Sequence, residues 1–423
     1  MSRLPLIIFI GLGILALIAV AALLGVGRKE GAPPAATIEF WGLEDESVWR
    51  GAFQKLYETK PHLTVNYKRL DETSYETVLV NRLAEGRGPD VFLLKNTWIK
   101  KHRDKVFPFP ADFFKIPARE VIAPFADGPA AEILTPEGAL LGLPLSIDSP
   151  VLLYNKDMLN AAGIAALPRT WTDFALVVRK LSSKTPAGDL IKSGGALGTY
   201  REITYAFEVL STFFLQHGDA VVNRIPPAVA LGDQAIQALE TYTSFANPSG
   251  ENFSWSGRFG NSFDAFVEER TAIVPAFTQD ISRLRSRNAH LNIGVLPFPQ
   301  LKEARVPVVY ARYYFPVVST MSRRKTQAWE LVMFLASREA AEAYTKATGR
   351  PPSRRDLLSE NAPSQELAVA YRQALIAKGW PVPDEPAVAR LFEGAVDAVV
   401  NRRVNPSRAI AELREKMELL LRQ

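Results

Sequence analysis

Strand and helix patterns alternate regularly between residues 37 and 95, and this order limits the folds open to the chain. TIEFWGL is rich in β-formers, and the apolar residues of DESVWRGAFQKLYETK behind it recur at helical spacing. LTVNYKRL alternates apolar and polar positions, SYETVLVNRLAEG is again helical, and DVFLL is a short apolar strand. This order predicts a parallel sheet joined by right-handed crossovers, so the expected fold class is α/β.

The rest of the chain is richer in helix and returns to strands after residue 270. Helical patterns include TWTDFALVVRKLSS, EITYAFEVLSTFFLQHG and DQAIQALETYTSFAN, whereas TAIV, NIGVLPFP and YARYYFPVVS are expected strands. TQAWELVMFLASREAAEAYTKATG predicts two helices that end at Gly349. Because the chain has 423 residues, two or three compact units are expected.

An apolar segment precedes the α/β pattern. LPLIIFIGLGILALIAVAALLGVG, residues 4–27, is apolar throughout, with Arg3 before it and Arg28 and Lys29 after it. A membrane-spanning helix needs about 20 apolar residues, whereas a cleaved signal peptide has an apolar region of about 7–15. Residues 1–30 are therefore predicted to be an uncleaved transmembrane anchor, and residues 31–36 a linker.

Composition argues against several classes of function. Lys and Arg number 50 against 45 Asp and Glu, and no basic run is interleaved with aromatic residues, so nucleic-acid binding is not expected. The chain has no cysteine, which excludes disulfides, zinc–thiolate sites and a cysteine nucleophile. The histidines lack metal-ligand spacing, and phosphate-loop and nucleophile-elbow motifs are absent from the sequence. We therefore expect neither an enzyme nor a metal or cofactor.

Aromatic residues stand beside polar ones where several expected strands end. Trp41 ends the first strand, and Trp98 follows Asn96 and Thr97 after DVFLL. Ligands of open α/β sheets bind beyond the carboxyl ends of strands, although a single Trp is more typical of a core. Phe277 and Gln279 follow the expected strand TAIV, and Tyr313 lies beside Arg312. Trp255 is an aromatic residue in a polar loop, and we add it to these candidate ligand contacts.

Several stretches, in order along the chain, resemble the family 1 extracellular solute-binding proteins of ABC transporters, which include maltose-binding protein. The most specific are GLPLSIDSPVLLYNKDMLNAAGI with LPRTWTDF behind it, and AWELVMFLASREAAEAYTKATGRPPSRRDLL. RLAEGRGPDVFLL, FDAFVEERTAIV and IGVLPFP agree less specifically. The resemblance implies a type II periplasmic-binding-protein clamshell, with two α/β lobes joined by crossing hinge strands behind the N-terminal helix.

The resemblance also implies a division of the chain. LPLSIDSPVLLYN would be the first crossing between lobes, with Asp148 facing the cleft, and VVYARYYFPVVS the return. Lobe one would comprise residues 37–147 and 276–312, and lobe two residues 148–275 and 313–423. A monomer would bind a small solute, most simply a carbohydrate or oligosaccharide, outside the cytoplasmic membrane and deliver it to permease subunits.

Family ligand contacts map onto three loops. They correspond to Trp41, Glu44 and Asp45, to Asn96, Thr97 and Trp98, and to Phe277 and Gln279. The sequence departs from the family in two ways. The lipid-bearing cysteine of many members is missing, and large residues, among them Arg312 and Tyr313, stand where members usually have small, glycine-rich residues leading into the second crossing. Arg312 is therefore expected either to bind an anionic or aromatic part of the ligand or to pair with Asp148.

Two other functions remain open from the residues. A membrane-tethered enzyme acting on a polysaccharide would need two carboxylates about 5–10 Å apart, and Asp148 with Glu44 or Asp45 is the pair to test. A sensory or scaffold protein could use the same clamshell to report a solute to a partner.

Overall fold

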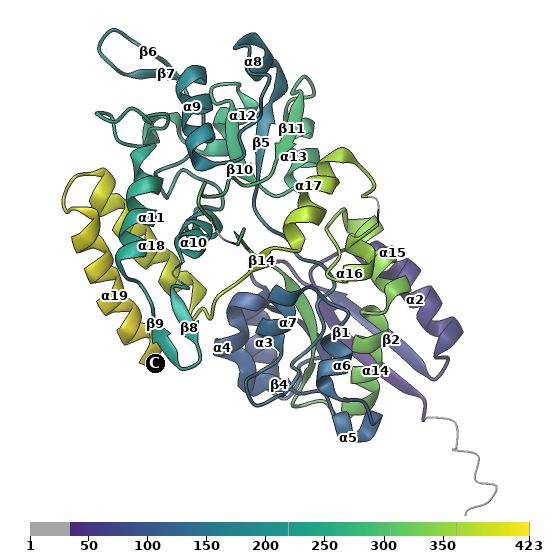
Figure 1. The fold of residues 1–423 in the computed structure, drawn as a ribbon. Coiled ribbons are helices and arrows are strands. Elements are labelled where there is room, and N and C mark those ends of the chain that lie inside the picture. Colours follow the sequence, from purple (N-terminus) through teal and green to yellow (C-terminus); the bar gives the residue numbers. More distant parts are fainter. Residues whose placement is uncertain (1–33, 219, 305, 361, 423) are drawn as a thin grey trace, which may run out of the picture.

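The computed structural model describes residues 34–218, 220–304, 306–360 and 362–422. These residues form two α/β lobes joined by several crossings of the chain (Figure 1). The predicted anchor, residues 1–30, lies outside the described residues, as do the first three residues of the predicted linker. Among the helices that are described, we find none with the length and apolar character needed to cross a membrane.

Lobe one is built on a five-stranded mixed sheet. The expected parallel unit is confirmed, because β1 pairs in parallel with both β2 and β3. β13 is antiparallel to β3 and to β4. The first four residues of β3 are buried, as in a sheet covered on both faces. The strand order is β2 (Leu63–Arg69), β1 (Ala36–Gly42), β3 (Val91–Lys95), β13 (Tyr314–Ser319) and β4 (Val106–Phe107).

Helices from two distant parts of the chain cover this sheet. The C-terminal members pack with the N-terminal ones, and α15 contacts α2 directly. The lobe-one helices are α2 (Glu46–Thr59), α3 (Tyr75–Ala84), α4 (Ile99–His102), α5 (Ala111–Phe114), α6 (Ala118–Ile122), α7 (Asp127–Ile133), α14 (Lys325–Leu335), α15 (Arg338–Thr348) and α16 (Arg355–Leu358).

Lobe two has a smaller antiparallel sheet and more helix. β5 (Val151–Asn155) lies between β10 (Ile273–Ala276) and β11 (Ile293–Leu296). Two hairpins, β6–β7 (Ser183–Lys184, Leu190–Lys192) and β8–β9 (Val222–Arg224, Pro227–Val229), project from the lobe (Figure 1). Its helices are α8 (Lys156–Ala161), α9 (Trp171–Leu181), α10 (Ala206–His217), α11 (Asp233–Ser244), α12 (Ser262–Val267), α13 (Asp280–Arg287), α17 (Gln365–Ala374), α18 (Glu385–Val400) and α19 (Pro406–Arg422).

Local signals in the sequence explain where two of these helices begin and end. Thr170 caps α9 by accepting the backbone N–H of Asp173, whose carboxylate accepts the N–H of Thr170 in return. Gly349 follows α15 with a φ of 68°, a left-handed conformation that glycine adopts without a Cβ clash. The predicted helix pair ending at Gly349 is therefore confirmed as α14 and α15.

The sheet memberships correct the predicted division of the chain. Residues 276–312 were assigned to lobe one, but β11 within this range pairs with β5 of lobe two. Residues from 313 onward were assigned to lobe two, but β13 completes the lobe-one sheet and carries α14 and α15 with it. The division taken from the resemblance was wrong because the sequence reveals that a strand exists but not which strand it pairs with.

Candidate functional site

Four chain segments lie side by side where the lobes meet, and we call them the hinge layer: residues 351–354, 145–148, 309–313 and 377–379. Residues 145–148 and 309–313 run from one lobe to the other. Ser146 bridges to Pro352, and Asp148 bridges to Arg312. On the far side, β12 (Val309–Tyr310) pairs in parallel with β14 (Ala377–Lys378). The predicted crossings at Asp148 and Arg312 therefore lie next to each other at the centre of the layer.

The hinge layer has two faces with different chemistry. Asp148 and Arg312 exchange backbone hydrogen bonds of 2.9 and 2.8 Å, so their side chains share one side, which we call the arginine face. Successive residues of an extended chain point to opposite sides. Tyr313 accordingly contacts Glu132 on the other side, which we call the tyrosine face.

Arg312 is enclosed by groups of lobe two. Its guanidinium lies 3.9 Å from the ring centroid of Phe277 and 4.9 Å from that of Tyr205, in the geometry of cation–π contacts. Its nearest carboxylate is Glu208 of α10, at 3.3 Å. The predicted pair with Asp148 is thus formed by the two backbones, while the charged side chain of Arg312 binds Glu208.

Arg350 joins the two lobes on the arginine face. Its Nη1 donates to Glu44 Oε1 at 2.7 Å in lobe one, and its Nε donates to Gln279 Oε1 at 2.9 Å in lobe two. The same Nε lies 3.5 Å from Asp148 Oδ2 in the hinge layer. With Tyr344, whose hydroxyl donates to Glu44 at 2.9 Å, these residues form the Arg350 network. The left-handed turn at Gly349 ends α15 immediately before Arg350, so Arg350 leaves the helix axis at this point.

Burial sets the protonation of the charged groups here. Burial raises the pKa of Asp148, although Arg350 and Arg312 act in the opposite direction. Burial likewise raises the pKa of Asp280, which accepts the backbone N–H of Phe277 at 2.9 Å. Burial disfavours the charge on Arg350, but Tyr344, Asp148 and Glu44 outweigh it and the pKa of Arg350 is raised. The arginine is therefore a fixed positive charge between two carboxylates.

One carboxylate oxygen in the network has no partner among the described residues. Glu44 is 7% exposed, and its Oε1 binds Arg350 and Tyr344, but its Oε2 accepts no hydrogen bond. A buried acceptor without a donor costs free energy unless a ligand or water supplies one. Glu44 Oε2 can therefore accept a hydroxyl or N–H from a molecule held between the lobes.

Five predicted site residues meet at this place. Glu44 follows β1, Asp148 lies in the hinge layer, and Phe277 and Gln279 follow β10. Arg312 contacts Phe277 directly. Residues that sequence reasoning missed complete the group: Arg350 and Tyr344 at the end of α15, and Tyr205, Glu208 and Asp280 in lobe two. Gly349 predicts a helix end, so it was the one sequence signal that Arg350 lies in the turn directly after a helix.

Thr97 contacts lobe two at a second place, and Asn96 beside it contacts the hinge layer. Thr97 Oγ1 donates to Glu385 of α18 at 2.6 Å, and the neighbouring Lys95 binds the same carboxylate at 2.5 Å. Asn96 Nδ2 donates to the carbonyl of Ala311 at 3.0 Å and to Glu132 at 3.3 Å. These residues thus bind groups of α18 and the hinge layer, and Asn96 shares Glu132 with Tyr313.

Trp41, Trp98 and Asp45 make contacts other than those of the Arg350 network. Trp41 is mostly buried beneath Lys68, which is 4.7 Å from its ring centroid, and Trp98 stacks on Tyr75. Asp45 is exposed and pairs with Arg69 at 3.2 Å.

Trp255 is the clearest correction to the predicted site. It is fully buried in lobe two, stacked on Phe259, and donates to Thr199 at 3.1 Å. Its polar loop folds back over the lobe, because Trp255 and Ser254 both donate backbone hydrogen bonds to Phe245. It is therefore a core residue.

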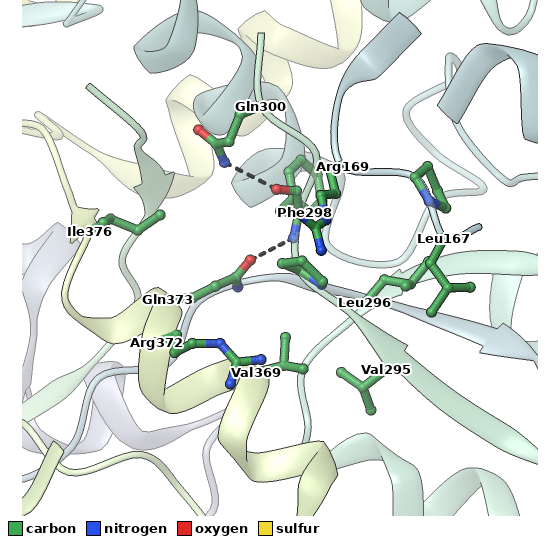
Figure 2. A pocket seen from close by; sticks show the side chains of 12 residues that line it. Leu167, Arg169, Val295, Leu296, Phe298, Gln300, Val369, Arg372, Gln373 and Ile376 are labelled. Atoms are coloured by element: carbon green, nitrogen blue, oxygen red, sulfur yellow. Dashed lines mark hydrogen bonds between the residues drawn. The ribbon is translucent and has the colours of Figure 1, made fainter. Parts of the chain in front are cut away.

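Two cavities differ in whether a ligand bound in them would contact both lobes. A cavity of about 240 Å³ beside the Arg350 network is lined by Gln279 and α13 of lobe two and by Thr348 and Gly349 of lobe one. A larger one of about 620 Å³, shown in Figure 2, lies within lobe two between β11, α17 and residues 167–169. Ligand-driven closure requires contacts that differ between the open and closed states. The smaller cavity, touching both lobes, meets this requirement.

Gln373 ties the larger cavity to the hinge region. Figure 2 shows its side-chain amide accepting the backbone N–H of Phe298, and the same amide donates to the carbonyl of Pro150 at 2.8 Å.

Within the described part of the chain, no group of three or more His, Asp and Glu side chains is placed so that it could hold a metal ion.

Two α/β lobes that share a polar network at a hinge define a two-lobe solute-binding protein. The chain belongs to the bacterial extracellular solute-binding protein family, whose model matches residues 41–342. It is therefore a solute-binding protein of the ABC-transporter type, and its family acts outside the cytoplasm. The relatives found are binding proteins rather than enzymes.

Individual relatives are distant. A probable amino-acid ABC transporter periplasmic-binding protein of Sinorhizobium fredii is 23% identical over 85% of this chain and 83% of its own length. The galactooligosaccharide-binding protein of Bacillus subtilis is 22% identical over 65% of each chain. The crystal structure of the cyclic α-maltosyl-1,6-maltose binding protein of Arthrobacter globiformis has a TM-score of 0.78 at 14% identity, covering 92% of this chain and 99% of that one. This likeness shows the shared fold.

Proposed function

We propose that the chain captures a carbohydrate between its lobes at the Arg350 network and delivers it to an ABC-transporter permease. The observation that carries the proposal is the position of Arg350, which contacts lobe one, the hinge layer and lobe two at once. A solute that exchanges hydrogen bonds with these groups would contact both lobes and favour the closed state.

The chemistry of the network supports a polyhydroxylated ligand. Glu44 Oε2 is an acceptor without a partner among the described residues. The partly buried ring of Tyr205 lies beside polar groups, an arrangement suited to the apolar face of a sugar ring. Several structural relatives are sugar-binding proteins, among them one bound to maltotetraose. The proposal also places the folded part outside the membrane, attached by residues 4–27.

Thermal unfolding of the full-length chain tests this proposal against a panel of sugars, oligosaccharides, amino acids, peptides and polyamines. A ligand at 100 times its Kd stabilises by about 2.7 kcal/mol, which is readily measured as a rise in Tm. We expect one sugar class to raise the Tm without being converted to product. A rise with amino acids alone, or turnover of an oligosaccharide, would contradict the proposal.

A matched pair of variants then locates the site. Gln279→Ala removes a lobe-two contact of Arg350, whereas Gln234→Ala changes an exposed glutamine on α11. We expect the first to weaken sugar binding and the second to leave it unchanged. Equal affinities would place the solute elsewhere.

A further inference from the structure

A second interlobe cavity lies on the tyrosine face of the hinge layer. Asn96 and Glu132, which line it, are the partners of Tyr313, so it is on the side opposite the Arg350 network. Its volume is about 480 Å³, within the range of roughly 300–1,000 Å³ of small-molecule sites. Lobe one contributes α4 and the end of α7, and lobe two contributes the β8–β9 hairpin beside α4 (Figure 1), residues 380–382 and the end of α19.

The walls of this cavity are mainly apolar and come from both lobes. Ile225, at the tip of the hairpin, is 68% exposed, although it lines the cavity. Apolar surface that remains in contact with water gains free energy when a ligand covers it. The apolar lining includes Ile99 and Leu141 of lobe one and Val222, Ile225, Trp380 and Leu421 of lobe two.

Unused hydrogen-bond donors lie among these apolar walls. Trp380 is 3% exposed, and its Nε1 donates to no group among the described residues. Arg224 makes a single 3.4 Å hydrogen bond, to the carbonyl of Glu132, and pairs with no described carboxylate. Lys100 donates to the carbonyl of Leu421 at 2.8 Å, and burial lowers its pKa. Each of these three residues lines the cavity and can donate to an acceptor bound there.

The carboxylates that line the cavity are already occupied. Glu132 accepts from Tyr313 at 2.9 Å, from Asn96 at 3.3 Å and from the backbone N–H of Gly379. Glu137 pairs with Arg103 at 2.9 Å. Because Lys100 and Arg224 are both cationic and Glu132 is the one further carboxylate in the lining, the cavity carries an excess positive charge.

We propose that this cavity binds an amphipathic monoanion, a carboxylate or sulfonate on a compact apolar body. Arg224 and the indole N–H of Trp380 hold the anionic group, and the hairpin and α4 cover the apolar body. Because the walls belong to both lobes, occupancy changes the equilibrium between open and closed lobes. This last step rests on the proposed solute-binding function, whereas binding of the anion does not.

Fluorine NMR titration of the full-length chain with para-trifluoromethylbenzenesulfonate tests the site directly. We expect saturable binding, with the neutral sulfonamide analogue binding more weakly. Arg224→Gln should weaken sulfonate binding about tenfold, the effect of losing one charge-assisted hydrogen bond. The control Arg201→Gln, which changes an arginine that is 74% exposed on lobe two, should leave it unchanged.

A second variant keeps the proposal testable if circular dichroism shows that Arg224→Gln does not fold. Trp380→Phe keeps an aromatic ring but removes the indole N–H, so it should weaken the sulfonate severalfold and affect the sulfonamide less. Absence of saturable binding, or equal affinity in the Arg224→Gln and Arg201→Gln variants, would overturn the site.

The absence of native cysteine allows the coupling to be measured with two spin labels. Lys55→Cys on α2 and Thr172→Cys on α9 place labels at exposed positions of opposite lobes. We expect the sulfonate to shift the distribution of distances between the labels. Binding without such a shift would overturn the coupling but leave the anion site. Failure of the sugar panel would count against the proposed function alone, because the sulfonate titration contains no sugar.

Discussion

The two faces of the hinge layer are built from the same strands and hold the lobes together differently. On the arginine face, Arg350 connects Glu44, Asp148 and Gln279 by directed polar contacts at 2.7–3.5 Å. On the tyrosine face, a buried carboxylate, Glu132, gathers donors of the hinge layer beside an apolar cavity. One face is suited to a polar solute, and the other to a ligand with an apolar body.

The difference follows from the alternation of side chains along an extended chain. Arg312 and Tyr313 are neighbours in sequence, yet one contacts Glu208 and the other Glu132. Any movement of the lobes about these strands must change contacts on both faces. A ligand on either face is therefore able to influence the other.

Removing Arg350 should give the largest effect on stability. Arg350→Ala leaves Glu44 and Asp148 buried without their cation, and breaking a buried ion pair costs about 3–5 kcal/mol. We expect about 3 kcal/mol, since 23% of the Arg350 side chain is exposed. Urea unfolding of the variant measures it. Arg258→Ala, which breaks a pair whose arginine is 82% exposed, should cost under about 1 kcal/mol. Similar losses in both would show that the network is not a buried unit.

On the tyrosine face, Tyr313→Phe should cost about 1.5–3 kcal/mol, because it removes one hydrogen bond to a buried carboxylate. Solute affinity should not change, since the hydroxyl points away from the Arg350 network. Chemical unfolding gives the stability and solute titration gives the affinity, both measured on the same preparation. Tyr57→Phe, at a tyrosine of α2 that is 41% exposed, is the control. A large loss of solute affinity would move the solute site to the tyrosine face.

Gln279→Ala should have a smaller effect on stability, about 0.5–1.5 kcal/mol, because it removes a hydrogen bond that is partly replaced by water. Its effect on sugar affinity should exceed its effect on unfolding. A stability loss without any change in affinity would make Gln279 a structural contact between lobes.

Asp148→Asn should produce the smallest change, seen as a difference in pH dependence. Burial raises the folded-state pKa of Asp148 above 3.8, so the protonated form is favoured on folding. That contribution is fully present below the unfolded-state pKa and is lost as the pH rises through the folded-state pKa. Relative to the native chain, the variant should therefore gain stability as the pH rises from acid to neutral. Thermal unfolding across this range checks it, with the exposed Asp45→Asn as control; a parallel profile would contradict the prediction.

Much of the fold could be read from the sequence, because it depends on local patterns. The parallel unit of β1 to β3 and the helix stop at Gly349 were predicted from periodicity and a glycine signal. The resemblance supplied the crossing at Asp148. Glu44, Phe277, Gln279 and Arg312 were correctly expected to follow strand ends or lie at a crossing, and they gather at one place. Their roles in binding stay predictions.

Other site residues could not be judged from their neighbours in sequence. Trp255 stands among polar residues, yet its loop folds back and buries it completely. Trp98 follows a strand end, as a ligand contact would, but packs on Tyr75. A polar surrounding in sequence does not reveal what a loop packs against in space.

The sequence by itself determined the order of strands and helices, the family and the position of the hinge crossing. These depend on contacts and patterns within a few residues. Tertiary structure decided that β11 belongs to lobe two, that β13 completes lobe one, and that Arg350 meets Glu44 306 positions away. Such contacts join segments whose separation in sequence carries no local signal, and they form when each lobe pairs its strands and buries its core.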